Sequence, residues 1–227
     1  MTKQTKTELK TVLLTGFEPF GGESINPSWQ AVKQLHGQSI NDHQVECVEL
    51  PCEFGRSLEH LYQAIEKHQP SLVLCIGQAG GRSHISIERI AINIDDARIA
   101  DNAGNQPVDI TIIDDAPAAY FAKLPIKTMY KGLLEAGIPV EVSNTAGTYV
   151  CNHVMFGLLD YIARHFGENE ESIQGGFIHI PFLPEQAVHH SGAPSMSQTT
   201  VVAALKLLIK NGLSSGPDLK VAAGTTH

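Results

Sequence analysis

The feature that most constrains the fold is an alternation of short apolar segments with segments of helical periodicity. The apolar segments are rich in Val, Ile and Leu and lack strict polar alternation, which is typical of strands covered on both faces. They span residues 11–15, 45–50, 72–76, 140–142 and 176–180. The intervening segments repeat apolar residues at helical spacing, as at Leu58, Leu61, Tyr62 and Ile65. This pattern predicts an α/β fold in which helices cover an at least partly parallel sheet.

Local signals predict where several helices begin and end. Asn26 is a suitable N-cap and Pro27 a suitable first residue for a helix that runs to Leu35. Further helices are expected from about residue 150 to 162 and from 200 to 209, the last one ending before Asn211 and Gly212. The acidic segment 93–125 is expected to form a long excursion or a short strand pair outside the main sheet.

Length and composition favour one globular domain. The chain has 227 residues, of which 42% are hydrophobic and 18% charged, so it can bury a core and is not a disordered chain. We expect a flexible N-terminal extension over residues 1–10, a single domain over 11–212, and a polar tail over 213–227 that is flexible. The net charge of −8 argues against nucleic acid or anionic lipid as a partner.

Cysteine usage and the N-terminal sequence favour the cytoplasm. No apolar run approaches the roughly 20 residues that a membrane-spanning helix needs, and no apolar segment of signal-peptide length follows the Lys-rich N-terminus. Cys47, Cys52, Cys75 and Cys151 are therefore expected to be free thiols. The first three lie in or beside apolar strands, where a cysteine is usually a small core residue.

Cys151 has a different setting. A predicted strand ends near Val142, a loop of small and polar residues follows, and a helix is expected to begin between Thr148 and Val150. Cys151 therefore lies in the first turn of a helix, where the helix dipole favours a thiolate and unpaired backbone N–H groups can hold an oxyanion. These features make Cys151 a candidate nucleophile.

A nucleophilic thiol needs a base, and His179 is the strongest candidate among the histidines. It lies at the end of the apolar strand 176–180, where it is either a buried core residue or a side chain aimed at the edge of the sheet. His153 follows Cys151 by two positions on the same helix, so the two side chains point apart. Glu88 and Asp101 are candidates for an acid that orients the base.

Taken together in chain order, several segments resemble the pyrrolidone carboxyl peptidases, also called pyroglutamyl peptidase I. The matching segments cover most of the chain from Thr11 to about Pro184, and the ordered set is far more specific than any one of them. They are Thr15–Gly22 (TGFEPFGG) with Asn26–Trp29, Gly77–Arg82 (GQAGGR) with Glu88–Arg89, Asp96–Arg98 with Asp101–Asn102 and Gln106–Pro107, Ser143–Asn152 (SNTAGTYVCN), and His179–Pro181. Ala100 departs from the family pattern, which commonly has Pro at this position.

The resemblance implies an α/β/α sandwich with a twisted, mostly parallel sheet, and a cysteine peptidase that removes N-terminal pyroglutamate from peptides and proteins. It implies a catalytic triad of Glu88, Cys151 and His179, often in a cytosolic homotetramer, with no metal or organic cofactor. It also implies that Phe17 and Phe20 wall the pyroglutamyl pocket, that Gln78 recognises the lactam, and that Arg98 lies near the oxyanion site.

Two other functions fit parts of the sequence. A glutaminase or a phosphorylase-like enzyme would also suit a cysteine after a strand, and activity on free glutamine would distinguish a glutaminase. A non-catalytic protein on the same scaffold could bind pyroglutamyl termini, and alkylation of its thiols would then find no activity to remove. The glycine-rich segments lack the G-x-G-x-x-G fingerprint and the Lys-Ser/Thr of a P-loop, and no zinc-ligand spacing is present.

Overall fold

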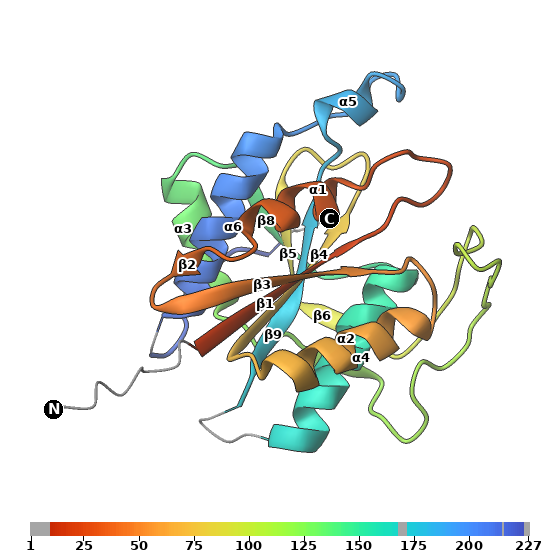
Figure 1. The fold of residues 1–227 in the computed structure, drawn as a ribbon, viewed down its shortest axis with the longest axis horizontal. Coiled ribbons are helices and arrows are strands. Elements are labelled where there is room, and N and C mark those ends of the chain that lie inside the picture. Colours follow the sequence, from red (N-terminus) through yellow and green to blue (C-terminus); the bar gives the residue numbers. More distant parts are fainter. Residues whose placement is uncertain (1–9, 168–171, 215, 225–227) are drawn as a thin grey trace, which may run out of the picture.

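A computed structural model describes residues 10–167, 172–214 and 216–224. Its centre is a seven-stranded sheet with the strand order β2-β3-β1-β4-β9-β5-β8 (Figure 1). The strands are β1 (Lys10–Phe17), β2 (Ser39–Ile40), β3 (His43–Leu50), β4 (Leu72–Gln78), β5 (Ile85–Glu88), β8 (Val140–Ser143) and β9 (Gln174–Ile180). The helices are α1 (Pro27–Val32), α2 (Arg56–His68), α3 (Ile126–Glu135), α4 (Val150–Phe166), α5 (Pro184–Ala187) and α6 (Gln198–Gly212), with a short 3-10 turn at Lys33–Leu35.

Helices cover both faces of the sheet, which confirms the predicted α/β sandwich. Helices α1, α3 and α6 lie on one face, and α2 and α4 lie on the other (Figure 1). Strand β4 shows why the strands lack polar alternation. Leu74 and Ile76 pack into the first layer while Val73 and Cys75 pack into the second, and all four side chains are buried. Both sides of each central strand therefore face apolar helices.

Most of the sheet is parallel, but the two strands at one edge, β5 and β8, reverse direction. Strand β1 pairs in parallel with β3 and β4, and β4 pairs in parallel with β9. Strand β5 runs antiparallel to β9, and the edge strand β8 runs parallel to β5. The chain that leaves β8 must therefore cross back over β5 and β9 before it can begin α4 above the centre of the sheet.

The acidic excursion and the first helix follow their sequence predictions. Strands β6 (Ile90–Ile92) and β7 (Ala119–Phe121) form an antiparallel pair that is separate from the main sheet. The side chain of Asn26 accepts a hydrogen bond of 3.0 Å from the N–H of Ser28, and Pro27 is the first residue of α1. These local signals were sufficient to predict the start of α1, because helix capping depends only on residues that are neighbours in the sequence.

Among the elements that escaped the sequence prediction, β5 and α3 are the most informative. Strand β5 has only four residues and carries Ser86 and Glu88 on one face, so it lacks an apolar signature. Helix α3 buries only Met129 and Leu133, which is too short an apolar stripe to indicate a helix by itself.

The predicted N-terminal extension lies outside the described residues, apart from Lys10 in β1. The predicted tail is described only over 213–214 and 216–224. Among the described residues, no helix combines the length and the apolar character that crossing a bilayer requires.

Candidate active site

Cys151 lies in the first turn of α4, directly above strand β4. A methyl group placed on Gly77 would come within 2.9 Å of its Sγ atom. The same methyl group would come within 2.7 Å of the ring of Phe177 on β9. Only glycine at position 77 therefore leaves room for the sulfur to rest against the sheet, at the boundary between β4 and β9.

His179 lies on the strand next to Gly77 and on the same face of the sheet as Cys151. Gly77 and His179 are register partners in the parallel pair β4–β9. The Phe177 ring, which packs in the layer under α4, lies 4.9 Å from the imidazole ring, centre to centre. The structure thus brings the sulfur and the imidazole to neighbouring strands, although β8, which precedes Cys151, runs opposite to β9.

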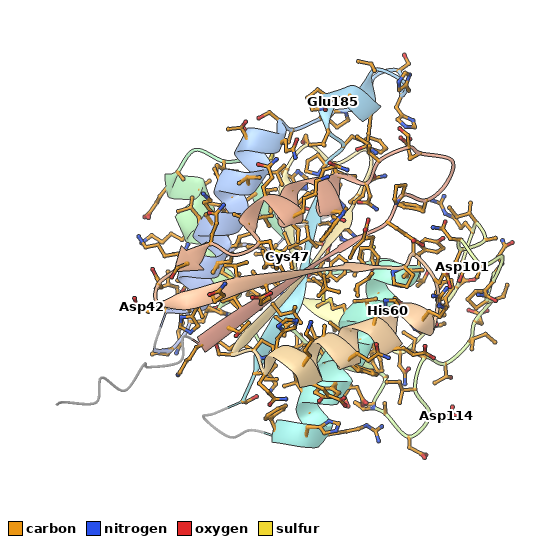
Figure 2. The ribbon with its side chains drawn as sticks, in the orientation of Figure 1. Asp42, Cys47, His60, Asp101, Asp114 and Glu185 are labelled. Carbon is orange, nitrogen blue, oxygen red and sulfur yellow. The ribbon has the colours of Figure 1, made fainter. Side chains whose placement is uncertain are left out.

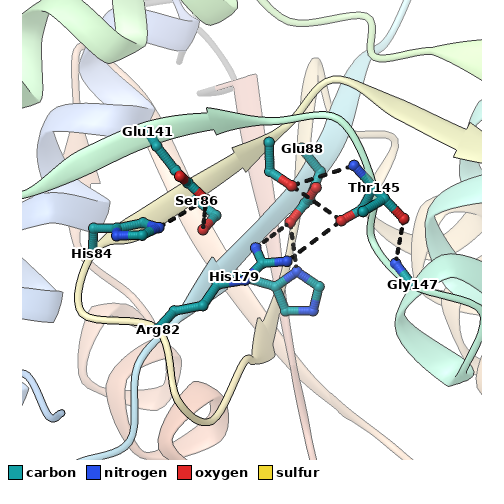
Figure 3. A network of polar contacts seen from close by, with 9 residues as sticks. Arg82, His84, Ser86, Glu88, Glu141, Thr145, Gly147 and His179 are labelled. Carbon is teal, nitrogen blue, oxygen red and sulfur yellow. Dashed lines mark hydrogen bonds and ion pairs between the residues drawn. The ribbon is translucent and has the colours of Figure 1, made fainter. Parts of the chain in front are cut away.

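Glu88 holds the imidazole from the other side. Its Oε1 atom lies 2.8 Å from Nδ1 of His179, and its side chain is fully buried at the end of β5 (Figure 3). Because a carboxylate can only accept a hydrogen bond, Nδ1 carries the proton and donates it. The lone pair of Nε2 is then left free to accept a proton from a thiol.

Hydrogen bonds keep the buried Glu88 carboxylate ionised. Burial raises its pKa, but the hydrogen bonds that it accepts from His179 and Arg82 outweigh burial, so the pKa lies below its ordinary value. Arg82 Nη1 lies 2.9 Å from the same Oε1 atom that accepts from His179. The acid of the pair is therefore negatively charged at neutral pH.

The Cys151 thiol behaves differently from the sequence expectation. The start of a helix was expected to favour the thiolate, yet burial raises the pKa of the Cys151 thiol well above its ordinary value. The nearby groups Cys52 and Glu88 add to this increase, and Arg82 offsets it in part. The thiol therefore needs a base to become nucleophilic.

The start of α4 also offers backbone donors. Its N-cap is Tyr149, and no side chain in the described part of the chain makes a capping hydrogen bond to this helix end. The N–H groups of the first turn, including that of Cys151, have no intrahelical acceptors. They are therefore available to stabilise a negative oxygen beside the sulfur.

A pocket of about 410 Å³ lies beside this helix start. It is lined by Phe20, Asp96, Arg98, Ile99, Gly147, Thr148 and Tyr149. Phe20 and Arg98, two of the four predicted substrate-binding residues, therefore share one hollow. A more open pocket of about 420 Å³ lies at the other end of β9, beside Gln174 and Asp218, and contains none of the predicted site residues.

Phe17 and Gln78 lie close by but in other environments. Phe17 is 2% exposed and packs against Phe177, with ring centres 6.2 Å apart. The side-chain Oε1 of Gln78 accepts a hydrogen bond of 3.0 Å from Nε2 of Gln186, a buried residue of α5. The oxygen of the Gln78 side chain is thus already paired, and Phe17 supports the site from within the core.

The remaining sequence candidates have structural partners of their own. Asp101 lies on the long excursion (Figure 2) and accepts hydrogen bonds from the N–H groups of Phe54, Ala103 and Asn105. His153 places Nδ1 2.8 Å from Asp95 and accepts a bond of 3.0 Å from Gly55 N–H. As predicted, His153 points away from the sulfur. The structure brings Glu88, not Asp101, to His179.

Sequence reasoning assigned no role to Arg82, Ser143 and Tyr149. All three lie within the segments that carry the family resemblance, and this position was the only signal in the sequence that could have pointed to a role for them. Tyr149 lines the pocket and donates its hydroxyl proton to the carbonyl of Ala100 over 3.1 Å. This bond secures the loop of Arg98 although Ala100 stands where the family commonly has Pro.

Comparisons with known proteins agree with this geometry. The family model described as pyroglutamyl peptidase matches residues 10–214. The pyrrolidone-carboxylate peptidases of Yersinia pestis (strain Pestoides F) and Yersinia pseudotuberculosis serotype I are 57% identical over 219 residues, covering 96% of this chain and 100% of theirs.

Solved structures give the same result. Pyroglutamyl peptidase I from Bacillus amyloliquefaciens is 48% identical with a TM-score of 0.89, covering 94% of this chain and 99% of that one. A mutant pyrrolidone carboxyl peptidase from the hyperthermophile Pyrococcus furiosus is 45% identical with a TM-score of 0.84, covering 89% and 98%. The chain therefore belongs to the pyroglutamyl peptidase family of enzymes.

Proposed function

We propose that this protein hydrolyses the amide bond after an N-terminal pyroglutamyl residue, through a thioester on Cys151. The observation that carries the proposal is the alignment of Glu88, His179 and Cys151 on one face of the sheet, beside a pocket. A hydrogen-bonded acid and base next to the thiol of a half-buried cysteine is the arrangement that nucleophilic catalysis requires.

The first half of the reaction forms the thioester. Nε2 of His179 takes the proton of the Cys151 thiol while Sγ attacks the carbonyl carbon that follows the pyroglutamyl ring. Glu88 stabilises the imidazolium that results. The N–H groups at the start of α4, together with Arg98, stabilise the oxyanion, and one such donor contributes about 3 kcal/mol. The C–N bond then breaks, and the leaving amine takes the proton from His179.

The second half regenerates the thiol. His179, neutral again, removes a proton from water, which attacks the thioester carbonyl. The C–S bond breaks, pyroglutamate leaves, and the imidazolium returns a proton to the sulfur. No metal or organic cofactor takes part in either half of this scheme.

The pocket suits an uncharged cyclic terminus. A pyroglutamyl ring has no free amine, so a mostly apolar hollow with few polar contacts should bind it. We propose that Phe20 forms a wall of this hollow and that Phe17 supports it from the core. Gln78, whose side chain is held by Gln186 at the end of β4, completes the lactam contacts. Tyr149 and Ile99 add apolar surface on the side of Arg98.

We also propose the setting in which the enzyme works, on the basis of the family resemblance. The protein is a cytoplasmic homotetramer whose substrates are peptides or proteins with N-terminal pyroglutamate. Light scattering should then give a mass close to four times that of the 24.5 kDa chain. A monomer at working concentration would contradict the tetramer but would leave the catalytic proposal intact.

Hydrolysis of a fluorogenic pyroglutamyl amide tests the function. The wild-type protein should release the fluorophore, and Cys151→Ala should reduce the rate to background while the far-UV circular dichroism spectrum stays unchanged. Cys47→Ala is a matched control, because Cys47 is a half-buried free cysteine on β3 that packs in the opposite helical layer from Cys151. Near-wild-type activity in Cys151→Ala, or activity on free glutamine instead of the blocked amide, would refute the proposal.

A further inference from the structure

In the described part of the chain, Glu88 forms two ion pairs. One is with His179 of the predicted triad, and the other is with Arg82. It follows the glycine-rich turn after β4, and its side chain reaches the end of β5 (Figure 3). Its Nη1 atom lies 2.9 Å from Oε1 of Glu88, the atom that also accepts from His179 over 2.8 Å. The Oε1 atom of Glu88 therefore accepts two hydrogen bonds, one from Arg82 and one from His179.

The second nitrogen of Arg82 reaches the loop that leads to Cys151. Its Nη2 lies 3.5 Å from the carbonyl oxygen of Thr145. That carbonyl also accepts from the hydroxyl of Ser143 over 3.0 Å, and the hydroxyl of Thr145 accepts from the N–H of Gly147 over 3.0 Å (Figure 3). The guanidinium thus joins the acid of the triad to the segment that places the nucleophile.

We propose that Arg82 is a positioning residue for catalysis, which holds Glu88 ionised and fixes its orientation toward His179. The inference rests on the proposed function, and it names a residue that acts through the triad without contacting substrate. The guanidinium is always charged and is planar, so it can serve the carboxylate and a backbone carbonyl in one orientation.

Charge explains why the triad needs this residue. Glu88 is fully buried, and in a medium of low polarity a carboxylate paired with one neutral imidazole is costly to keep ionised. If Glu88 were protonated, it would become a donor and would no longer fix the proton of His179 on Nδ1. Nε2 would then not be reliably free to accept the thiol proton. A permanent positive charge 2.9 Å away prevents this.

The surroundings of Glu88 supply no second cation for this task in the described part of the chain. The groups that face it are His179 from β9, Ser143 from β8 and Cys151 from α4, in addition to Arg82. Farther along the same face, Glu141 lies 2.7 Å from Nε2 of His84 and 3.2 Å from the hydroxyl of Ser86. His84 and Ser86 are therefore paired with Glu141. Arg82 itself is 28% exposed, which leaves its charge partly screened but in place.

The test compares Arg82→Met with Arg82→Lys. Arg82→Met removes the charge and both contacts, so kcat/KM for a pyroglutamyl amide at pH 7 should fall roughly 10- to 100-fold, the range of a charge-assisted hydrogen bond. Loss of the cation also raises the pKa of Glu88, so the acid limb of the pH–rate profile should move up by at least about half a unit. Arg82→Lys should restore the acid limb, because it restores the charge.

Alkylation of Cys151 separates this inference from the proposed function. The rate at which iodoacetamide modifies Cys151 in the free protein depends on its thiolate and base, and it requires no turnover of any substrate. Its pH profile should shift upward in Arg82→Met and return in Arg82→Lys, even if pyroglutamyl amides proved not to be substrates. Arg164→Met is the matched control, since it removes an ion pair with Asp160 elsewhere on α4 and should leave both profiles unchanged.

Two results would overturn the proposal. One is an Arg82→Met protein with wild-type kcat/KM and an unshifted alkylation profile. The other is a loss of activity that is equal at all pH values and is not recovered in Arg82→Lys, which would indicate a purely structural role. A melting temperature for each variant shows whether the fold has survived.

Discussion

Gly77 determines how closely the sulfur of Cys151 can approach the sheet. Its missing side chain leaves the space that the Cys151 sulfur occupies, and the neighbouring Phe177 ring closes that space from the other side. Both neighbours are held in packed elements, so an added methyl group could be accommodated only if the sulfur or the ring moved. The geometry of the site therefore requires that residue 77 has no side chain.

Gly77→Ala should displace the Cys151 thiol and lower kcat by at least about 100-fold, because misplacement of a reacting group by about 1 Å costs that much. Steady-state kinetics and the rate of iodoacetamide alkylation measure the effect. Gly176→Ala is the control, since its methyl group would meet Leu124 on the other face of the sheet and should reduce stability without moving the sulfur. Wild-type kcat in Gly77→Ala would show that the sulfur does not work from this position.

Helix α4 carries Cys151, and the element is anchored to its surroundings at its first turn. Asn152 is 1% exposed, and its side chain accepts from the N–H of Ile92 over 3.0 Å. It also donates to the carbonyls of Ile92 and Ile94 over 2.8 and 3.1 Å. The first turn of α4 is thus bound to the end of β6 and the start of the long excursion.

Asn152→Ala should leave the N–H of Ile92 and the carbonyl of Ile94 without partners, whereas the carbonyl of Ile92 still accepts from the N–H of Ile94. The expected loss is about 2–3 kcal/mol of unfolding free energy, which corresponds to a fall in melting temperature of roughly 5–10 °C for a chain of this size. Differential scanning calorimetry measures the change. An unchanged melting temperature would show that water or a shift of the excursion replaces the amide without cost.

The elements also show which parts of the site the sequence could predict. The helix start at Cys151 and the strand of His179 followed from local patterns, and the resemblance linked them to Glu88. The crossing of the loop after β8 did not follow, because strand direction at that edge is set by the pairing of β5 with β9. The tethering of Gln78 by Gln186 and the contact of Arg82 with Glu88 depend on tertiary packing, and no spacing in the sequence encodes them.

At the scale of the whole molecule, the C-terminal segment packs against the helical layer behind the sheet. Asp218 accepts hydrogen bonds from the N–H groups of Lys127 and Thr128 and from the hydroxyl of Thr128, at the start of α3. Burial raises the pKa of Asp218, but these bonds outweigh burial and lower it below its ordinary value. Part of the predicted tail thus caps α3, the helix that packs against α6.

Asp218→Asn keeps a capping oxygen but removes the negative charge, so it should lower stability by about 0.3–1 kcal/mol, or about 1–4 °C in melting temperature. Because the folded pKa is depressed, this contribution is present above the unfolded pKa near 4 and is lost as the pH falls through the folded pKa. The gap between wild type and variant should therefore be wider at pH 7 than at pH 3. A gap of equal size at both values would refute the charge-based explanation.

The proposed function depends on one covalent step, the transfer of the pyroglutamyl group to the sulfur of Cys151. Acid quenching during turnover of a pyroglutamyl ester, followed by peptide mapping in the mass spectrometer, measures that step directly. A pyroglutamyl thioester on Cys151 should accumulate in the wild-type protein and be absent from Cys151→Ala. Turnover with the acyl group on another residue, or with no acylated protein and undiminished activity in Cys151→Ala, would contradict it.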